Sequence, residues 1–367
     1  MAEPVSSRPL TGTGTPHIAL LTILRGLAAW WIVLYHFNVY LPPVLVPTLR
    51  PAAGLGYLAV DLFFVMSGYV IALNYQAWFV ALNRRSYGKF LLLRLARIYP
   101  LHVATLLACL VNPAVTLLFS HLGVVSDRYA PLPFLYNLFL VQNWDTTRVL
   151  TWNIPAWSIS AECAAYLLFP AIILAARRCA ADWRMHLLGF AVLLGCIVQL
   201  GRLGGNLGGD ITELGTLRCL VEFSLGVLVY FASLGCCLTQ SRAWLLLLLG
   251  FAVLVGAARQ HWPDYAYAPF AFAVILLGAI YARLPEQAGW VGRWLIVIGE
   301  LSYSTYLVHY IVRDWVLFLT PASELNTPTL FVIYVSLTIL ASVTTFFLVE
   351  RPAQIYFRRR INAVFAP

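Results

Sequence analysis

The stretch Arg25–His36, RGLAAWWIVLYH, places an arginine and a histidine within a long apolar run. Eleven residues of α-helix turn through about 1100°, so both side chains would share one face, about 16 Å apart along the axis. Ionisable residues in a membrane-type segment are costly and are usually functional. The pair therefore predicts an anion anchor at Arg25 and a proton-handling group at His36. The alternative is that Arg25 extends to the lipid headgroups and His36 makes only a packing hydrogen bond.

A second cationic motif, Arg94-Leu-Ala-Arg97, precedes a further apolar run. Residues three apart share a helix face, and two guanidiniums there form a fork suited to phosphate groups. If Arg25 lies at the same leaflet, the three arginines favour a cytoplasmic ligand with several phosphates, and coenzyme A has three. The alternative is that Arg94 and Arg97 only anchor the helix at the inner membrane surface.

Two acids lie within apolar segments at a depth similar to that of His36. Glu162 lies in WSISAECAAY, four residues after Ser158 and four before Tyr166, so these three side chains form one stripe. Asp61 lies in GYLAVDLFFVMSGYVIA. Either carboxylate is a candidate to orient His36 and stabilise its charged form, as in hydrolase dyads. The alternative is that each acid only satisfies an arginine or backbone partner.

A fourth polar group follows in SYSTYLVH, where Ser302, Tyr306 and His309 share a face by helical spacing. These residues are candidates to line the path of an acyl group, or they make a polar contact between helices. His309 is the second candidate for the proton-handling role. The seven cysteines show no metal-ligand spacing, and we expect no metal.

The composition places the chain in a lipid bilayer. Its 367 residues are 61% hydrophobic and only 11% charged, whereas soluble domains carry about 25% charge. A surface this apolar cannot face water, so membrane lipid is the expected environment. The net charge of +9 needs no nucleic acid partner, since arginines suit both phosphate binding and the fixing of topology.

Hydropathy predicts an all-α polytopic membrane protein with about ten transmembrane helices. The expected spans cover about 18–40, 56–75, 90–111, 157–178, 185–202, 216–236, 243–259, 266–283, 294–318 and 328–350. An even number puts both termini on one side. With the termini inside, 17 of the 24 Lys and Arg residues lie on the inner side, which predicts cytoplasmic termini. Segment 134–143 is too short to span and is expected to be a re-entrant or interfacial segment on the outer side.

The chain is expected to form one transmembrane domain, residues 18–357, between two short tails. Residues 1–17 are polar and turn-rich and lack the pattern of a signal peptide, so we expect a disordered cytoplasmic tail. Residues 358–367 should form a basic cytoplasmic tail. No internal repeat is visible, which gives no support to an inverted-repeat transporter.

The motifs RGLAAWWIVLYHF, DLFFVMSGYVI, LLRLARIYP, WSISAECAAYLLFP and ELSYSTYLVHY occur in the order seen in the membrane acyltransferase-3 family, which the chain resembles from about residue 18 to 357. Members are bacterial integral-membrane O-acyltransferases of surface polysaccharides, and relatives act on small molecules such as macrolides. The resemblance implies transfer of an acyl group, with acetyl expected, from cytoplasmic acyl-CoA. The acceptor would be a hydroxyl of a saccharide or lipid-linked glycan, usually on the outer side of the bacterial cytoplasmic (inner) membrane. It also implies that His36 is the essential histidine and that Arg25, Arg94 and Arg97 bind the coenzyme.

Several alternatives stay open from the sequence. His36 is expected either to deprotonate the acceptor or to carry the acyl group itself. Some family members have an additional extracytoplasmic esterase-like domain; this chain is too short for one, so its core is expected to complete the transfer or act with a separate partner. A transporter or flippase, or a scaffold of a glycan-export complex, are the competing classes. The acceptor, the acyl chain length and the oligomeric state are not indicated.

Overall fold

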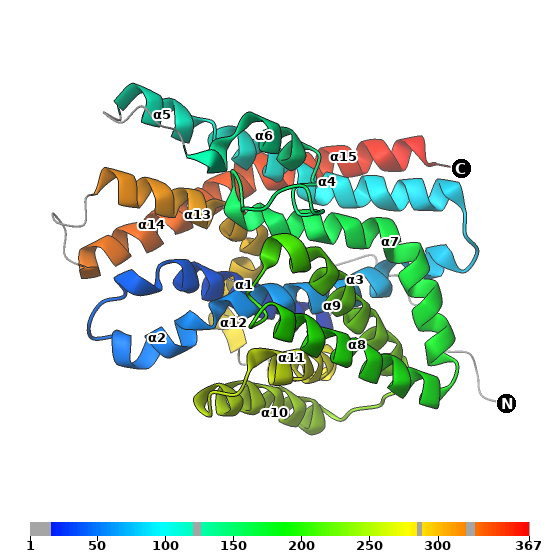
Figure 1. The fold of residues 1–367 in the computed structure, drawn as a ribbon. Coiled ribbons are helices and arrows are strands. Elements are labelled where there is room, and N and C mark those ends of the chain that lie inside the picture. The colour runs from blue at the N-terminus through cyan, green and yellow to red at the C-terminus, as the bar shows by residue number, and fades with distance from the viewer. Residues whose placement is uncertain (1–15, 120–125, 285–287, 321–326, 367) are drawn as a thin grey trace.

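The computed structural model describes residues 16–119, 126–284, 288–320 and 327–366, which form helices joined by short turns and contain no strand (Figure 1). This confirms the predicted all-α polytopic fold. The α-helices are α1 (Pro16–His36), α2 (Val46–Gly54), α3 (Ala59–Tyr75), α4 (Arg84–Ala108), α5 (Val111–Phe119), α6 (Pro131–Leu138), α7 (Trp157–Ala180), α8 (Trp183–Leu203), α9 (Ile211–Leu234), α10 (Gln240–Arg259), α11 (Asp264–Tyr281), α12 (Gly289–Glu300), α13 (Ser302–Leu319), α14 (Thr327–Thr345) and α15 (Arg351–Val364).

Nine helical stretches in the described parts of the chain are long and apolar enough to cross a membrane, and a tenth if a bent pair counts as one span. The bent pair is α12 and α13, which meet at an angle of 63° where one straight span over 294–318 was expected. The short segment 134–143 is the end of α6 followed by irregular chain. The predicted tail 1–17 lies almost entirely outside the described residues, while most of 358–367 continues helix α15.

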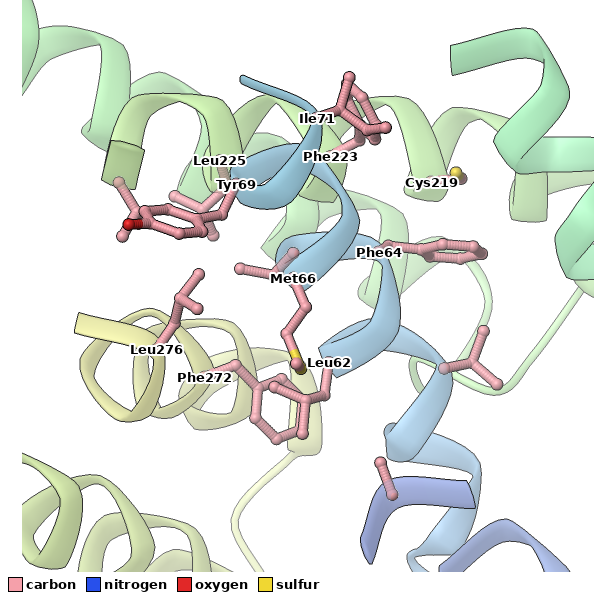
Figure 2. Packing of buried hydrophobic residues seen from close by; sticks show 14 of the residues in the cluster. Leu62, Phe64, Met66, Tyr69, Ile71, Cys219, Phe223, Leu225, Phe272 and Leu276 are labelled. Atoms are coloured by element: carbon pink, nitrogen blue, oxygen red, sulfur yellow. The ribbon is translucent and has the colours of Figure 1, made fainter. Parts of the chain in front are cut away.

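The core of the bundle forms where α3 crosses α9. Gly68 and Gly226 make this crossing close, because a Cβ on Gly68 would overlap the Phe223 carbonyl oxygen and one on Gly226 would overlap that of Val65. Small residues allow such close packing where lipid gives no hydrophobic drive between helices. Around the crossing, Figure 2 shows side chains from three helices: Leu62, Phe64, Met66, Tyr69 and Ile71 of α3, Cys219, Phe223 and Leu225 of α9, and Phe272 and Leu276 of α11.

Helix α1 is held against the break between α12 and α13. Gly299 packs so closely on Thr22 that a Cβ would overlap the Thr22 carbonyl oxygen. The last four carbonyls of a helix have no partner within it, so the end of α12 at Glu300 leaves acceptors beside α1. The break therefore supplies polar backbone groups to the region around Arg25.

Helix α15 lies beside α4 (Figure 1) and is reached through a single π-helical turn, Phe346–Glu350. Such turns occur mostly as local insertions in α-helices and often at functional sites. Here the turn directs the buried Glu350 toward α4, where its carboxylate pairs with Arg97. The side chain of Ser304 on α13 donates to the other carboxylate oxygen at 2.6 Å. One carboxylate thus connects three segments of the bundle.

Candidate active site

A cavity of about 260 Å³ lies between α1, α3, α4, α7 and α13. One wall is apolar and comes from α3. The rest carries eight of the residues that the sequence singled out: Arg25, Arg94, Arg97, Ser158, Glu162, Tyr166, Ser302 and Tyr306. Their side chains, far apart in the sequence, therefore line one hollow inside the bundle.

The three arginines each use only part of their hydrogen-bonding capacity on the protein. Arg25 donates from Nε to Ser302 Oγ at 2.9 Å and from Nη2 to the Gly299 carbonyl at 3.1 Å. Arg94 donates from Nη2 to the Tyr166 hydroxyl at 3.0 Å, and its Nε is buried without a hydrogen-bond partner in the described structure. A guanidinium has five N–H donors, so donors remain for a ligand.

Arg97 is more strongly engaged than the sequence suggested. It forms an ion pair with Glu350, and its guanidinium carbon lies 5.3 Å from the centroid of the Tyr303 ring. The Arg97 side chain is 27% exposed, whereas that of Glu350 is 1% exposed. Arg97 therefore has a structural role as the counter-ion of a buried acid, besides its position on the cavity wall.

The two carboxylates proposed as partners of His36 make their contacts with other side chains in the described structure. Glu162 lines the cavity, where it accepts a hydrogen bond from Ser67. Asp61 is fully buried at the crossing of α3 and α9, and its Oδ1 lies 3.2 Å from Nε of Arg218. Within the described residues, no hydrogen bond joins either acid to His36. The spacing placed all three at a similar depth, but depth does not specify which neighbour each helix face meets.

His36 instead contacts His309, the second histidine that the sequence singled out. The Nε2 atom of His309 lies 3.2 Å from Nδ1 of His36. The His309 ring is fully buried, whereas His36 is only partly buried. The structure thus brings together two imidazoles from α1 and α13.

The backbone carbonyls around the two rings determine the positions of their protons. Nδ1 of His309 lies 3.2 Å from the Thr305 carbonyl, and Nδ1 of His36 lies 3.1 Å from the Ile32 carbonyl. A carbonyl oxygen can only accept, so we assign hydrogen to both Nδ1 atoms in neutral rings; the single Nδ1–H of His36 is then shared between the Ile32 carbonyl and Nε2 of His309. This leaves Nε2 of His36 unprotonated and able to take a proton.

Polar contacts fix the position of this histidine pair. Arg313 donates from Nε to the His36 carbonyl at 2.9 Å. The neighbouring Asp314 accepts from Arg128 at 2.7 Å, which connects α13 to the loop before α6. On the cavity side, the Tyr306 ring centroid lies 6.0 Å from that of His309, and its hydroxyl lies 2.7 Å from Ser158 Oγ. Tyr306 therefore stands between the cavity and the histidine pair.

Some polar residues of the bundle were not singled out in the sequence. Ser67 donates a hydrogen bond to Glu162, and Glu350 forms an ion pair with Arg97. Glu222 is buried on α9 near Asp61 and Arg218. A signal existed for Glu222 and Glu350: Glu222 lies four residues after Arg218 in a predicted span, and Glu350 ends an apolar run. Among the described residues, no group of three or more His, Cys, Asp or Glu side chains is arranged to hold a metal ion.

The helices and the cavity together define an integral-membrane protein with a polar site inside its bundle. A family model described as "Acyltransferase domain" matches residues 18–347, so this chain belongs to that acyltransferase family, as its motifs predicted.

Two curated proteins are similar to the chain. One is Acyltransferase MdmB from Streptomyces mycarofaciens, 37% identical over 124 residues, which are 32% of this chain and 28% of that protein. The other is Peptidoglycan O-acetyltransferase OatA from Listeria monocytogenes, 22% identical over 368 aligned positions, which cover 90% of this chain and 54% of that protein. The matches thus span about a quarter and about half of these relatives. No solved structure matches the chain.

Proposed function

We propose that this acyltransferase moves an acyl group, most simply acetyl, from acyl-CoA to a hydroxyl of a saccharide or lipid-linked glycan. The observation that carries the proposal is the arrangement of one cavity with Arg25, Arg94 and Arg97 on its wall, next to the pair of His36 and His309. The name of the Listeria relative, a peptidoglycan O-acetyltransferase, supports a glycan acceptor. A small-molecule acceptor such as a macrolide is the second candidate, because members of the family that the motifs resemble acylate both.

The donor phosphates would bind the arginines. The unpaired N–H of Arg94 and the free donors of Arg25 match phosphate oxygens, which accept charge-assisted hydrogen bonds. The thioester arm would extend along the apolar wall of α3 toward Tyr306. Glu162, which accepts a hydrogen bond from Ser67, would make a polar contact along this arm. By the excess of arginine at this end of the bundle, the donor would enter from the cytoplasmic side of a bacterial inner membrane.

His36 would act as the base through Nε2. It takes the proton of the acceptor hydroxyl while the hydroxyl oxygen bonds to the thioester carbon and the carbon–sulfur bond breaks. The sulfur leaves as a thiolate, which is stable because thiols have a pKa near 8.5, and later recovers the proton. His309 and the Ile32 carbonyl would together hold His36 in the required tautomer through their contacts with Nδ1. In the alternative route, Nε2 of His36 carries the acyl group between donor and acceptor.

The test is acyl transfer from labelled acyl-CoA to an acceptor in proteoliposomes that contain the purified protein. His36→Ala should lower the rate by about 10²–10⁴-fold, the usual contribution of a general base, with coenzyme binding nearly unchanged. His36→Gln should not restore transfer, because an amide cannot take a proton at neutral pH.

Turnover, coenzyme binding and thermal stability should be measured on the same preparations. Substantial transfer by a well-folded His36→Gln protein would remove His36 from the mechanism and leave His309 as the candidate base. Movement of an acceptor across the membrane without acylation would instead identify a transporter.

A further inference from the structure

A second pocket, of about 410 Å³, adjoins the cavity between the end of α3, α4 and α15. Asn74, Arg94 and Arg97 line both hollows. The two arginines therefore stand at the junction between an inner cavity and an outer pocket. We call this second hollow the outer pocket; Trp78, Lys89, Gln354, Arg358 and Asn362 contribute to its wall.

The outer pocket carries positive charge that the protein does not neutralise. Its lining contains Lys89, Arg94, Arg97 and Arg358 and no Asp or Glu. Arg97 is paired with Glu350, but neither Lys89 nor Arg358 has an ion-pair partner among the described residues. Unpaired cations in a hollow favour a ligand with several negative charges.

An aromatic side chain accompanies these cations. The Trp78 ring is half-buried, and the Lys89 ammonium lies 5.6 Å from its centroid. A flat indole beside cations suits a nucleobase next to its phosphates, because every nucleobase has a flat face that can stack on an aromatic ring. The amides of Gln354 and Asn362 add hydrogen-bonding groups, although Gln354 already donates to Glu350 at 3.1 Å.

The inner cavity is too small for a whole acyl-CoA, so part of this donor must lie elsewhere. At about 260 Å³ it lies below the usual range of roughly 300–1,000 Å³ for ligand pockets, so it suits the thioester arm and not a whole acyl-CoA. The nucleotide end must then lie outside it, and the junction at Arg94 and Arg97 leads into the outer pocket.

We propose that the outer pocket binds the adenosine 3′-phosphate end of acyl-CoA. Trp78 stacks on the adenine, Lys89 and Arg358 bind the 3′-phosphate, and Arg94 and Arg97 hold the diphosphate where the donor turns into the cavity. This assignment rests on the proposed function, because it takes acyl-CoA as the donor. It adds residues of the nucleotide site that no motif in the sequence indicated: Trp78 in the turn after α3, Lys89 on α4 and Arg358 on α15.

The test compares coenzyme A with dephospho-coenzyme A, which lacks only the 3′-phosphate, by equilibrium binding to the purified protein in nanodiscs. The wild type should bind coenzyme A roughly 10-fold or more tightly, the effect expected of a charge-assisted contact. Lys89→Ala and Arg358→Ala should each lose most of this preference while their affinity for dephospho-coenzyme A stays within about 3-fold, since the contact they lose is with the missing phosphate. Arg359→Ala, an exposed neighbour outside the pocket wall, removes the same charge and should keep the preference.

Trp78→Leu tests the aromatic contact separately. It should weaken both coenzymes by a similar factor, about 5- to 100-fold for the loss of one stacked base, and leave the affinity for phosphopantetheine, which lacks adenosine, unchanged.

The outcomes separate this inference from the proposed function. If the wild type binds coenzyme A in preference to dephospho-coenzyme A and Lys89→Ala and Arg358→Ala keep that preference, the outer pocket is not the phosphate site and the acyltransferase proposal stands. Equal binding of the two coenzymes by the wild type would also refute the assignment of the 3′-phosphate. If the wild type binds neither coenzyme, acyl-CoA is not the donor and both proposals fail.

Discussion

Arg97 has a structural role as the partner of Glu350 and a proposed role in binding the donor, and variants of this ion pair can separate the two roles. Replacing Arg97 with alanine removes a donor ligand and also leaves the Glu350 carboxylate, 1% exposed, without its counter-ion. Ser304 and Gln354 would still donate to that carboxylate, at 2.6 and 3.1 Å. These two neutral donors cannot replace the lost positive charge.

The expected magnitudes differ for the two roles. Removing one partner of a buried ion pair typically costs about 3–5 kcal/mol, and with two hydrogen bonds retained we expect the lower end, about 3 kcal/mol. Loss of one charge-assisted contact to a phosphate should cost about 1.5–3 kcal/mol, or about 10- to 150-fold in coenzyme affinity. Arg97→Ala should therefore show both a lower stability and weaker binding.

The double variant Arg97→Ala/Glu350→Gln distinguishes these effects. The introduced amide would be neutral and could still accept from Ser304, so most of the lost stability should return. Coenzyme affinity should stay as weak as in Arg97→Ala, because the phosphate ligand is still missing. Thermal unfolding in detergent and equilibrium binding of coenzyme A, measured on the wild type, both single variants and the double variant, complete the cycle.

One result would refute this reasoning directly. If the double variant binds coenzyme A as tightly as the wild type, Arg97 serves only as the partner of Glu350, and the weak binding of Arg97→Ala comes from a disturbed α4–α15 contact. Arg94, which has no acid partner in the described structure, would then carry the proposed phosphate contact of the motif.

The remaining predictions concern the core, the histidine pair and the topology. Arg218→Met should destabilise the protein by about 3–5 kcal/mol, because it leaves the buried Asp61 unpaired, and Asp61→Asn should cost less since Glu222 remains nearby; thermal unfolding measures both. His309→Phe keeps a ring but removes one acceptor of the His36 Nδ1–H, so kcat should fall about 10-fold or more with little change in KM, and an unchanged kcat would remove His309 from the positioning of His36. Reporters fused after Arg359 and within 84–89 should read cytoplasmic and one within 203–210 should read outside; an outside signal at 84–89 would reverse the orientation.

The fold could be predicted from the sequence to a large extent because membrane helices are specified by composition over long windows. The all-α class, the approximate number of spans and the family followed from apolar runs and ordered motifs, and they are confirmed. Helical spacing also correctly indicated which residues of one helix share a face, as with Ser158, Glu162 and Tyr166, which all line the cavity.

Partners on different helices could not be predicted in the same way. Spacing along one helix gives the depth and direction of a side chain, but which helix it meets depends on packing across the bundle. Glu162 and Asp61 illustrate this, since both lie within the helices expected for them and neither hydrogen-bonds His36 in the described structure. The partner of His36 is His309, 273 positions further along the chain, and only the packing of α1 on α13 brings the two together.

The two interruptions of regular helix lie beside the arginines of the cavity. Beside the 63° break at Leu301, the Gly299 carbonyl and the hydroxyl of Ser302, the first residue of α13, both accept from Arg25. The π-helical turn ends at Glu350, which pairs with Arg97. Irregular backbone at membrane depth is tolerated where it lines a cavity, since every polar backbone group needs a partner there.

Both interruptions therefore place an acceptor beside a guanidinium. In an α-helix each residue is turned by about 100° around the axis relative to the one before. Without the interruptions, the acceptors would therefore point away from the arginines that they now meet. Periodicity alone predicts straight spans through these positions and cannot show the breaks. Local departures from an otherwise consistent pattern tend to occur at functional sites. The wall of this cavity thus combines a largely apolar face from regular α3 with two cations, Arg25 and Arg97, whose partners lie at the irregular segments.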